Sequence, residues 1–188
     1  MIHAMKTLLV ALTALFALTL FAFTTHESRK LVKHRFFNDE LVGKPYIIID
    51  KSDYELRVFD DNGWYASYPV VLGSKSLDDK MIQGDRKTPE GVYKIASKRP
   101  HEKWDRMMLI DYPTKADIAK FNERKAKGLI PKSARLGDGI GIHGTWKNDD
   151  MAVDYYQQWT NGCIALKNDE IEELYSIIPV GTPVTIQR

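Results

Sequence analysis

Cys163 is the only cysteine of the 188-residue chain, and it follows Gly162 directly. His143 lies twenty positions earlier, in a segment bounded by Gly141 and Gly144. A thiol is a strong nucleophile only as the thiolate, and a neighbouring imidazole can take its proton or lower its pKa. If the fold brings the two side chains together, they predict covalent catalysis, with Cys163 as the nucleophile and His143 as general base and acid.

A buried structural residue is the alternative for Cys163, because unpaired cysteines are among the most buried residue types. Gly162 favours the catalytic interpretation, since it permits a tight turn that exposes the thiol. Such a turn can also direct backbone N–H groups toward a developing oxyanion. Four of the five histidines lie in the N-terminal segment or a charged loop, and only His143 lies in a strand-like setting between small residues.

The sequence predicts neither a metal nor a cofactor. It contains no His-x-x-x-His or Cys-x-x-Cys spacing, and Asp149, Asp150 and Asp154 lack the central glycine and terminal glutamate of a calcium loop. The segment from Gly84 to Tyr93 is no phosphate-binding loop, because no Gly-Lys-Ser/Thr follows in register.

The N-terminus predicts export. In residues 1–25, Lys6 precedes an uncharged apolar run from Leu8 to Phe23, which is typical of a signal peptide. No clean small-x-small cleavage pattern follows, so residues 7–23 could instead remain as a membrane anchor. We therefore expect a periplasmic or cell-wall protein, with anchoring in the inner membrane as the alternative. An exported chain with one cysteine forms no internal disulfide, which leaves the thiol available.

Composition indicates one catalytic domain. Basic and acidic side chains number 27 and 25, and removal of residues 1–24 leaves a formal charge of +1, which argues against nucleic-acid binding. Residues 26–43 are polar and charged, and they predict a tether or docking segment. Residues 44–188 are enough for one domain with its own hydrophobic core.

The hydrophobic pattern predicts an α+β fold that is mainly β. Alternating or β-branched runs predict strands at residues 46–50, 55–59, 64–72, 91–96, 107–111, 140–143, 163–166 and 183–186. Helices are expected at 115–127 and at 169–178, with Asn168 as N-cap of the second. Residues 113–135 could also form a lid or loop over the site.

Three segments together resemble the L,D-transpeptidase catalytic domain, the YkuD-type family. His143-Gly144-Thr145 and Thr160-Asn161-Gly162-Cys163, with sixteen residues between His143 and Thr160, resemble its His and Ser/Thr-x-Gly-Cys signature. The segment from Gly84 to Tyr93 resembles its upstream Gly-Asp and Thr-Pro-Glu-Gly motif. The likeness covers roughly residues 44–187 and implies a β-sandwich-like fold.

The resemblance implies a two-step acyl transfer on peptidoglycan stem peptides, in peptidoglycan crosslinking or modification. Cys163 would form a thioester with the donor, His143 would move the protons, and the backbone at Gly162 would hold the oxyanion. The acceptor would be a second stem peptide, the lysine of an envelope lipoprotein or another amine, or water. No cofactor is implied.

The chain departs from the family pattern on both sides of the nucleophile. Family members often carry His two residues before the cysteine and Arg two residues after it, where this chain has Asn161 and Ala165. The missing guanidinium could bind a substrate carboxylate, so we expect either that another cation such as Arg135 or Arg86 replaces it or that the substrate differs. The candidate substrate contacts are residues of the His and Cys motifs together with the candidate cation. They are Gly144, Thr160, Asn161 and Arg135.

Two other functions compete with acyl transfer. A thiol-dependent L,D-carboxypeptidase or endopeptidase would return the acyl group to water, and a non-catalytic peptidoglycan-binding module would need no thiol. The aromatic residues between His143 and Cys163 either line a groove for glycan or peptide or pack against the β core; these are Trp146, Tyr155, Tyr156 and Trp159.

Overall fold

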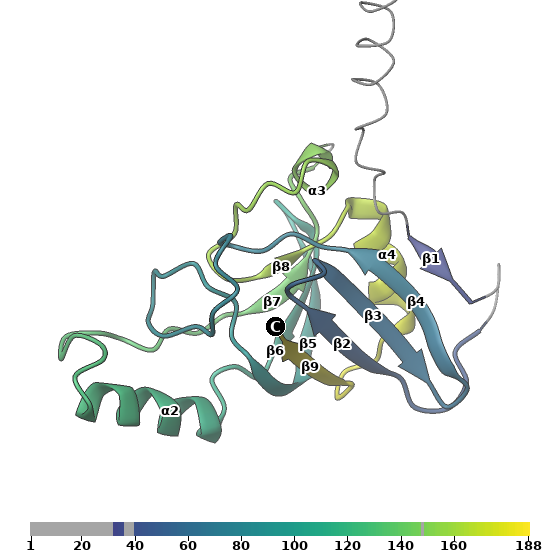
Figure 1. Ribbon diagram of the computed structural model, residues 1–188. Coiled ribbons are helices and arrows are strands. Elements are labelled where there is room, and N and C mark those ends of the chain that lie inside the picture. The colour runs from purple at the N-terminus through teal and green to yellow at the C-terminus, as the bar shows by residue number, and fades with distance from the viewer. Residues whose placement is uncertain (1–31, 36–39, 148) are drawn as a thin grey trace, which may run out of the picture.

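The computed structural model describes residues 32–35, 40–147 and 149–188 (Figure 1). Its strands are β1 (Lys33–His34), β2 (Tyr46–Asp50), β3 (Glu55–Asp60), β4 (Gly63–Pro69), β5 (Gly91–His101), β6 (Asp105–Ile110), β7 (Gly141–His143), β8 (Ile164–Ala165) and β9 (Pro183–Gln187). Its helices are α2 (Lys115–Ala126), α3 (Met151–Asp154) and α4 (Asn168–Ile177). The expected mainly β fold with a few helices is confirmed.

The strands follow one hydrogen-bonded order, β1-β4-β3-β2-β9-β5-β6-β7-β8. Strand β5 joins two halves of this order, because Gly91–Lys94 pairs with β9 and the residues beyond Ile95 pair with β6. Its register shifts between Ile95 and Ser97, and such irregularities bend a strand. A bridge between Val71 and Ala165 then brings the chain after β4 beside the last strand.

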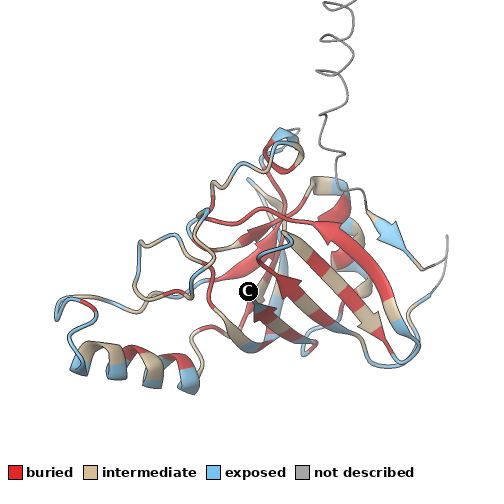
Figure 2. Cartoon of the chain, in the orientation of Figure 1, coloured by how far each residue is buried: buried red, intermediate tan, exposed pale blue. Residues whose placement is uncertain are grey.

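Both halves bury their apolar side chains in one core. Strand β3 alternates half-buried and buried residues along its whole length, as its polar and apolar alternation predicts (Figure 2). Residues from β2 to β9 and from α4 belong to the same cluster, including the fully buried Ile47, Ile142 and Ile164. Since Ile142 and Ile164 lie next to His143 and Cys163, the two motifs are attached directly to the core.

Helix α4 packs on this core through Ile171, Leu174 and Ile178, all fully buried. Burial of each such side chain contributes roughly 1.5–3 kcal/mol. The N-cap is Lys167, so the prediction of Asn168 was wrong. The side chain of Asn168 instead donates hydrogen bonds to Thr145 Oγ1 and to the carbonyl of Trp146, which anchors the chain after β7.

Helix α2 begins at Thr114, which closes a capping box with Asp117. Arg124 and Lys120 of this helix reach Asp79, at 2.7 and 3.1 Å. Helix α2 thus braces the loop before β5, and its Asp117 also accepts a hydrogen bond from Tyr93 of β5 at 3.1 Å. A lid or loop over the site formed by residues 113–135 stays a prediction.

The described part of the N-terminal segment lies against the domain. Strand β1 pairs antiparallel with β4, and Arg35 makes two hydrogen bonds of 2.9 and 3.0 Å to the buried Asp60. The predicted signal peptide or anchor, residues 1–25, lies outside the described residues. No helix among the residues that the structure describes is long and apolar enough to cross a membrane.

Candidate active site

Cys163 lies immediately before β8, not inside a strand as predicted. Its side chain is partly buried, and its thiol donates to the carbonyl of Gly139 at 3.5 Å. Burial raises the pKa of the Cys163 thiol above its usual value, while the backbone of Gly141 and the charge of Lys80 lower it. The net direction is upward, so the resting thiol is protonated at pH 7.

His143 ends β7 and is 1% exposed. Its Nδ1 lies 2.7 Å from the carbonyl of Gly144. A carbonyl only accepts, so Nδ1 carries the proton of this bond and Nε2 is left as the basic nitrogen. Burial lowers the pKa of His143 to about 4, with an opposing contribution from Gly144 and a further small decrease from His101. The imidazole is therefore neutral at pH 7.

Strands β7 and β8 bring the two motifs side by side. The strands are parallel neighbours, and His143 pairs with Ala165. Cys163 precedes Ala165 by two positions, so it lies in the chain just before this pair. No direct hydrogen bond joins the thiol to the imidazole in the described residues, because the thiol contacts Gly139 and Nδ1 contacts Gly144.

These pKa directions predict how Cys163 reacts with an alkylating reagent. We expect the rate of alkylation by iodoacetamide to rise with pH up to at least pH 9, because the thiol pKa is raised and the imidazole is too weak a base to ionise it. Intact-mass kinetics between pH 5 and pH 10 measure this rate, and Cys163→Ala supplies the unlabelled control. A plateau starting near pH 5 or 6 would instead reveal a resting thiolate–imidazolium pair.

Thr160 and Gly162 shape the turn before the nucleophile. Thr160 Oγ1 donates to the carbonyl of Cys163 at 2.7 Å and accepts the N–H of Gly162 at 3.2 Å. The N–H of Gly162, expected in the oxyanion hole, is thus engaged within the turn. The N–H of Cys163 itself has no acceptor among the described residues, which makes it the better placed donor for an oxyanion.

Gly162 is predicted to tolerate no side chain. Its φ of +120° disfavours other residues, and a Cβ would lie 2.6 Å from the carbonyl oxygen of Lys87. We expect Gly162→Ala to displace the turn and lower the rate of Cys163 acylation by about 10²-fold or more. Gly181→Ala is the matched control, because Gly181 also has a positive φ but nothing within 4 Å of its Cβ position. Equal acylation rates in the two variants would contradict the close packing described here.

The segment from Gly84 to Tyr93 supports this turn. Arg86 donates from Nε to the carbonyl of Thr160 at 3.2 Å and from its guanidinium to that of Gln158 at 2.8 Å. A buried ion pair between Lys51 and Glu90, at 2.7 Å, fixes the end of the segment beside β2. Arg86 therefore holds the nucleophile turn from outside, and its guanidinium is already engaged.

The other predicted substrate contacts have different positions. Gly144 is buried, and a Cβ there would lie 2.5 Å from Asn168 Oδ1 and 2.9 Å from the carbonyl oxygen of Trp104, so no side chain fits at this position. Thr160 is also buried in the turn. Asn161 is exposed and lines a pocket beside Cys163. Arg135 is exposed and is absent from that lining, although its carbonyl accepts the N–H of Gln83 at 2.7 Å.

The aromatic residues around His143 divide between packing and exposure. Trp104 stacks on His143 with ring centroids 4.6 Å apart, and Trp159 meets the imidazole edge-on at 5.5 Å. Trp146 packs against Trp159 but stays 44% exposed, and Tyr155 is 59% exposed. The packing interpretation thus applies to Trp159, and a groove lined by the exposed Trp146 and Tyr155 stays a prediction. Sequence reasoning missed Trp104, because no spacing links it to His143; its position after β5 was the only signal.

Lys80 is the second residue that sequence reasoning missed. It lies before Gly84, its side chain is 3% exposed, and it faces the pocket lined by Asn161. A lysine in a charged stretch reads as a solvated residue, and only the fold reveals its burial. No group of three or more His, Cys, Asp or Glu side chains that could hold a metal ion occurs among the described residues.

The chain matches a known protein family and individual known proteins. Residues 44–186 match the YkuD family, described as the L,D-transpeptidase catalytic domain. YqjB of Bacillus subtilis (strain 168), named as an L,D-transpeptidase candidate, is 32% identical over 150 residues, which cover 78% of this chain and 73% of YqjB. YafK of Escherichia coli (strain K12), named in the same way, is 26% identical over 149 residues, which cover 76% of this chain and 50% of YafK.

Solved structures share the fold. The helical cell shape determining protein Pgp2 from Campylobacter jejuni aligns with a TM-score of 0.58 and 22% identity, over 89% of this chain and 53% of Pgp2. The Enterococcus faecium L,D-transpeptidase C442S mutant aligns with a TM-score of 0.50 and 17% identity, over 78% of this chain and 50% of that protein. The chain thus spans about half the length of these solved relatives.

Proposed function

The chain belongs to the L,D-transpeptidase catalytic domain (YkuD) family, and from this premise we propose that it is a cell-envelope cysteine acyltransferase acting on peptidoglycan stem peptides. Cys163 is the nucleophile and His143 the general base and acid. The observation that carries the proposal is the parallel pairing of β7 with β8, which puts Cys163 two positions before the partner of His143, together with Nε2 of His143 left unprotonated.

The first step is acylation of Cys163. As the thiol attacks the carbonyl of the scissile peptide bond, its proton passes to Nε2 of His143, and the oxyanion is held by the N–H of Cys163. The C–N bond then breaks, the proton moves from His143 to the leaving amine, and a thioester remains. Because the resting thiol is protonated and the imidazole neutral, proton transfer accompanies attack instead of preceding it.

The second step transfers the acyl group. His143, neutral again, takes a proton from an incoming amine, which attacks the thioester and releases the thiol. The acceptor is a second stem peptide or another envelope amine, such as a lipoprotein lysine. Attack by water in place of the amine would make the same site an L,D-carboxypeptidase or endopeptidase. The predicted export signal supports action outside the cytoplasm, in the periplasm or cell wall.

Intact-protein mass spectrometry tests this proposal. The purified full-length chain is incubated with a disaccharide tetrapeptide, with and without an amine acceptor, and Cys163→Ala is treated in parallel. We expect an acyl adduct on the wild type that disappears when the amine is added, together with a new amide product. An adduct that yields only free acid would establish the hydrolase, and absence of any adduct would overturn covalent catalysis on this substrate.

A further inference from the structure

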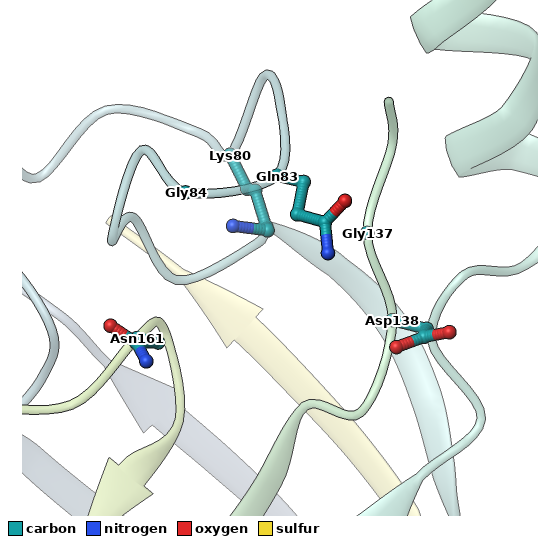
Figure 3. Close-up of a pocket in the computed structure, with 6 residues that line it drawn as sticks. All are labelled: Lys80, Gln83, Gly84, Gly137, Asp138 and Asn161. Carbon is teal, nitrogen blue, oxygen red and sulfur yellow. The ribbon is translucent and has the colours of Figure 1, made fainter. Parts of the chain in front are cut away.

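A pocket of about 300 Å³ opens beside the nucleophile and is lined by polar residues (Figure 3). Its lining consists of Lys80, Gln83, Gly84, Gly137, Asp138 and Asn161. Asn161 lies two positions before Cys163, and Asp138 lies directly before Gly139, whose carbonyl accepts the thiol proton. The pocket is therefore lined by the residues next to the nucleophile turn and by the residues next to the carbonyl that the thiol contacts, and part of a bound substrate could enter it.

Lys80 is the cation of this pocket. Its Nζ lies 2.7 Å from Asp85 Oδ1 and 3.5 Å from the carbonyl of Lys87. An ammonium group has three N–H donors, and the described residues supply acceptors for two of them. The third donor is available to a ligand in the pocket that Lys80 lines. The charge also lies near enough to Cys163 to lower the thiol pKa.

The negative charge of Asp85 offsets the positive charge of Lys80 only in part. Three backbone N–H groups also donate to its carboxylate, those of Met81 and Ile82 at Oδ2 and that of Lys87 at Oδ1. Although burial acts to raise the pKa of Asp85, these bonds and Lys80 hold it below its usual value. The carboxylate is thus ionised and shared among four donors, which leaves Lys80 able to attract an anionic group.

The two arginines expected to supply this charge are placed elsewhere. The guanidinium of Arg86 is bound to the carbonyls of Thr160 and Gln158, and Arg135 is not part of the pocket lining. Asp138, on another side of the pocket, would repel an anion placed against it. A carboxylate entering this space is therefore directed toward Lys80, where a charge-assisted hydrogen bond can form.

We infer that Lys80 determines substrate specificity by binding the free C-terminal carboxylate of the donor peptide, the group carried by the residue that leaves when Cys163 is acylated. This inference rests on the proposed function, because it requires a donor whose scissile bond lies one residue from its C-terminus. It adds to that function a requirement that thiol catalysis alone does not impose: a donor with a blocked C-terminus is a poor substrate.

Two donors that differ in one group test this directly. A disaccharide tetrapeptide with a free C-terminal acid is compared with its C-terminal carboxamide, and kcat/KM for acylation of Cys163 is measured. We expect the wild type to prefer the acid by about 10- to 100-fold, which is the usual contribution of a hydrogen bond to a charged group. The amide releases a less basic amine, so leaving-group chemistry would favour the amide and cannot produce this preference.

Variants of Lys80 test whether this residue causes the preference for the acid donor over the carboxamide donor. Lys80→Met should lose about 10- to 100-fold on the acid donor and discriminate little between the two donors. Because this change leaves the carboxylate of Asp85 without its buried partner, the double variant with Asp85→Asn provides a second form in which the pair is neutral. Lys75→Met is the matched control, since Lys75 is an exposed lysine of the same loop, and it should keep the wild-type preference.

The outcomes separate this inference from the proposed function. Equal acylation of acid and amide by the wild type, or a wild-type preference retained in Lys80→Met or in the double variant, would overturn the role of Lys80 and leave acyl transfer intact. Acylation by neither donor would overturn the proposed function and this inference with it.

Discussion

Replacement of Cys163 by alanine is expected to abolish acyl-enzyme formation and to lower product formation by at least about 10³-fold, because removal of a nucleophile leaves only binding and oxyanion contacts. The chain has no second cysteine that could substitute. Stability should change little, since the thiol is only partly buried and makes one hydrogen bond at 3.5 Å. Product formation from a tetrapeptide donor, with thermal unfolding as a check of the fold, measures both effects.

Cys163→Ser is the matched control for shape. Serine keeps the size of the side chain and a hydrogen-bond donor toward Gly139, but a hydroxyl is far less acidic than a thiol, and an imidazole with a pKa of about 4 is too weak a base to activate it. We expect this variant to fold as the wild type does and to be nearly inactive. Retention of more than about a tenth of the activity in Cys163→Ala would favour a non-catalytic, peptidoglycan-binding role.

Replacement of His143 by glutamine is expected to lower kcat/KM by about 10²- to 10⁴-fold at pH 7, because glutamine cannot take the thiol proton. The wild type should show an acid limb in kcat/KM near pH 4, where His143 becomes protonated, and His143→Gln should lack that limb. His34→Gln is the matched control, since His34 is an exposed histidine that contacts Glu173 at 2.6 Å. An unchanged acid limb in His143→Gln would contradict the role of His143 as base.

The same buried imidazole links stability to pH. In the unfolded chain His143 titrates near 6.5, and in the folded domain its pKa is lowered to about 4, so protonation favours unfolding. Its stabilising contribution is complete above pH 6.5 and is lost as the pH falls through 4, on the order of 3 kcal/mol in total. Denaturant unfolding at pH 7.5 and pH 4 should show a larger loss for the wild type than for His143→Gln.

The proposed catalytic pair, Cys163 and His143, was predicted from sequence because its signals are local. One thiol, one histidine between glycines and a glycine before the nucleophile are properties of short segments, and so is the alternation that predicted β3. Short-range patterns also located both long helices, because helical periodicity is a property of a single segment. The breaks at Pro113 and Gly128 are likewise visible in the local sequence, without knowledge of tertiary contacts. These features depend on residues a few positions apart, which the chain itself keeps together.

The surroundings of the pair depended on contacts between distant segments. Lys80 and Asn161 line one pocket although 81 positions separate them, and Trp104 stacks on His143 from the end of another strand pair. The sequence named Arg86 and Arg135 as cations of the site and not Lys80, because charge and proximity to a motif favour all three equally well; of the three, only Lys80 lines this pocket. Burial decides between them, and burial is known only once the sheet has closed.

The sequence by itself therefore determined the type of chemistry and the mainly β fold, since both follow from residue types and their local spacing. Tertiary structure alone decided that His143 is neutral, that the N–H of Gly162 is engaged and that Lys80 faces the pocket. The physical reason is that desolvation and hydrogen bonding depend on which segments pack together. Those quantities set protonation and charge, and no spacing along the chain encodes them.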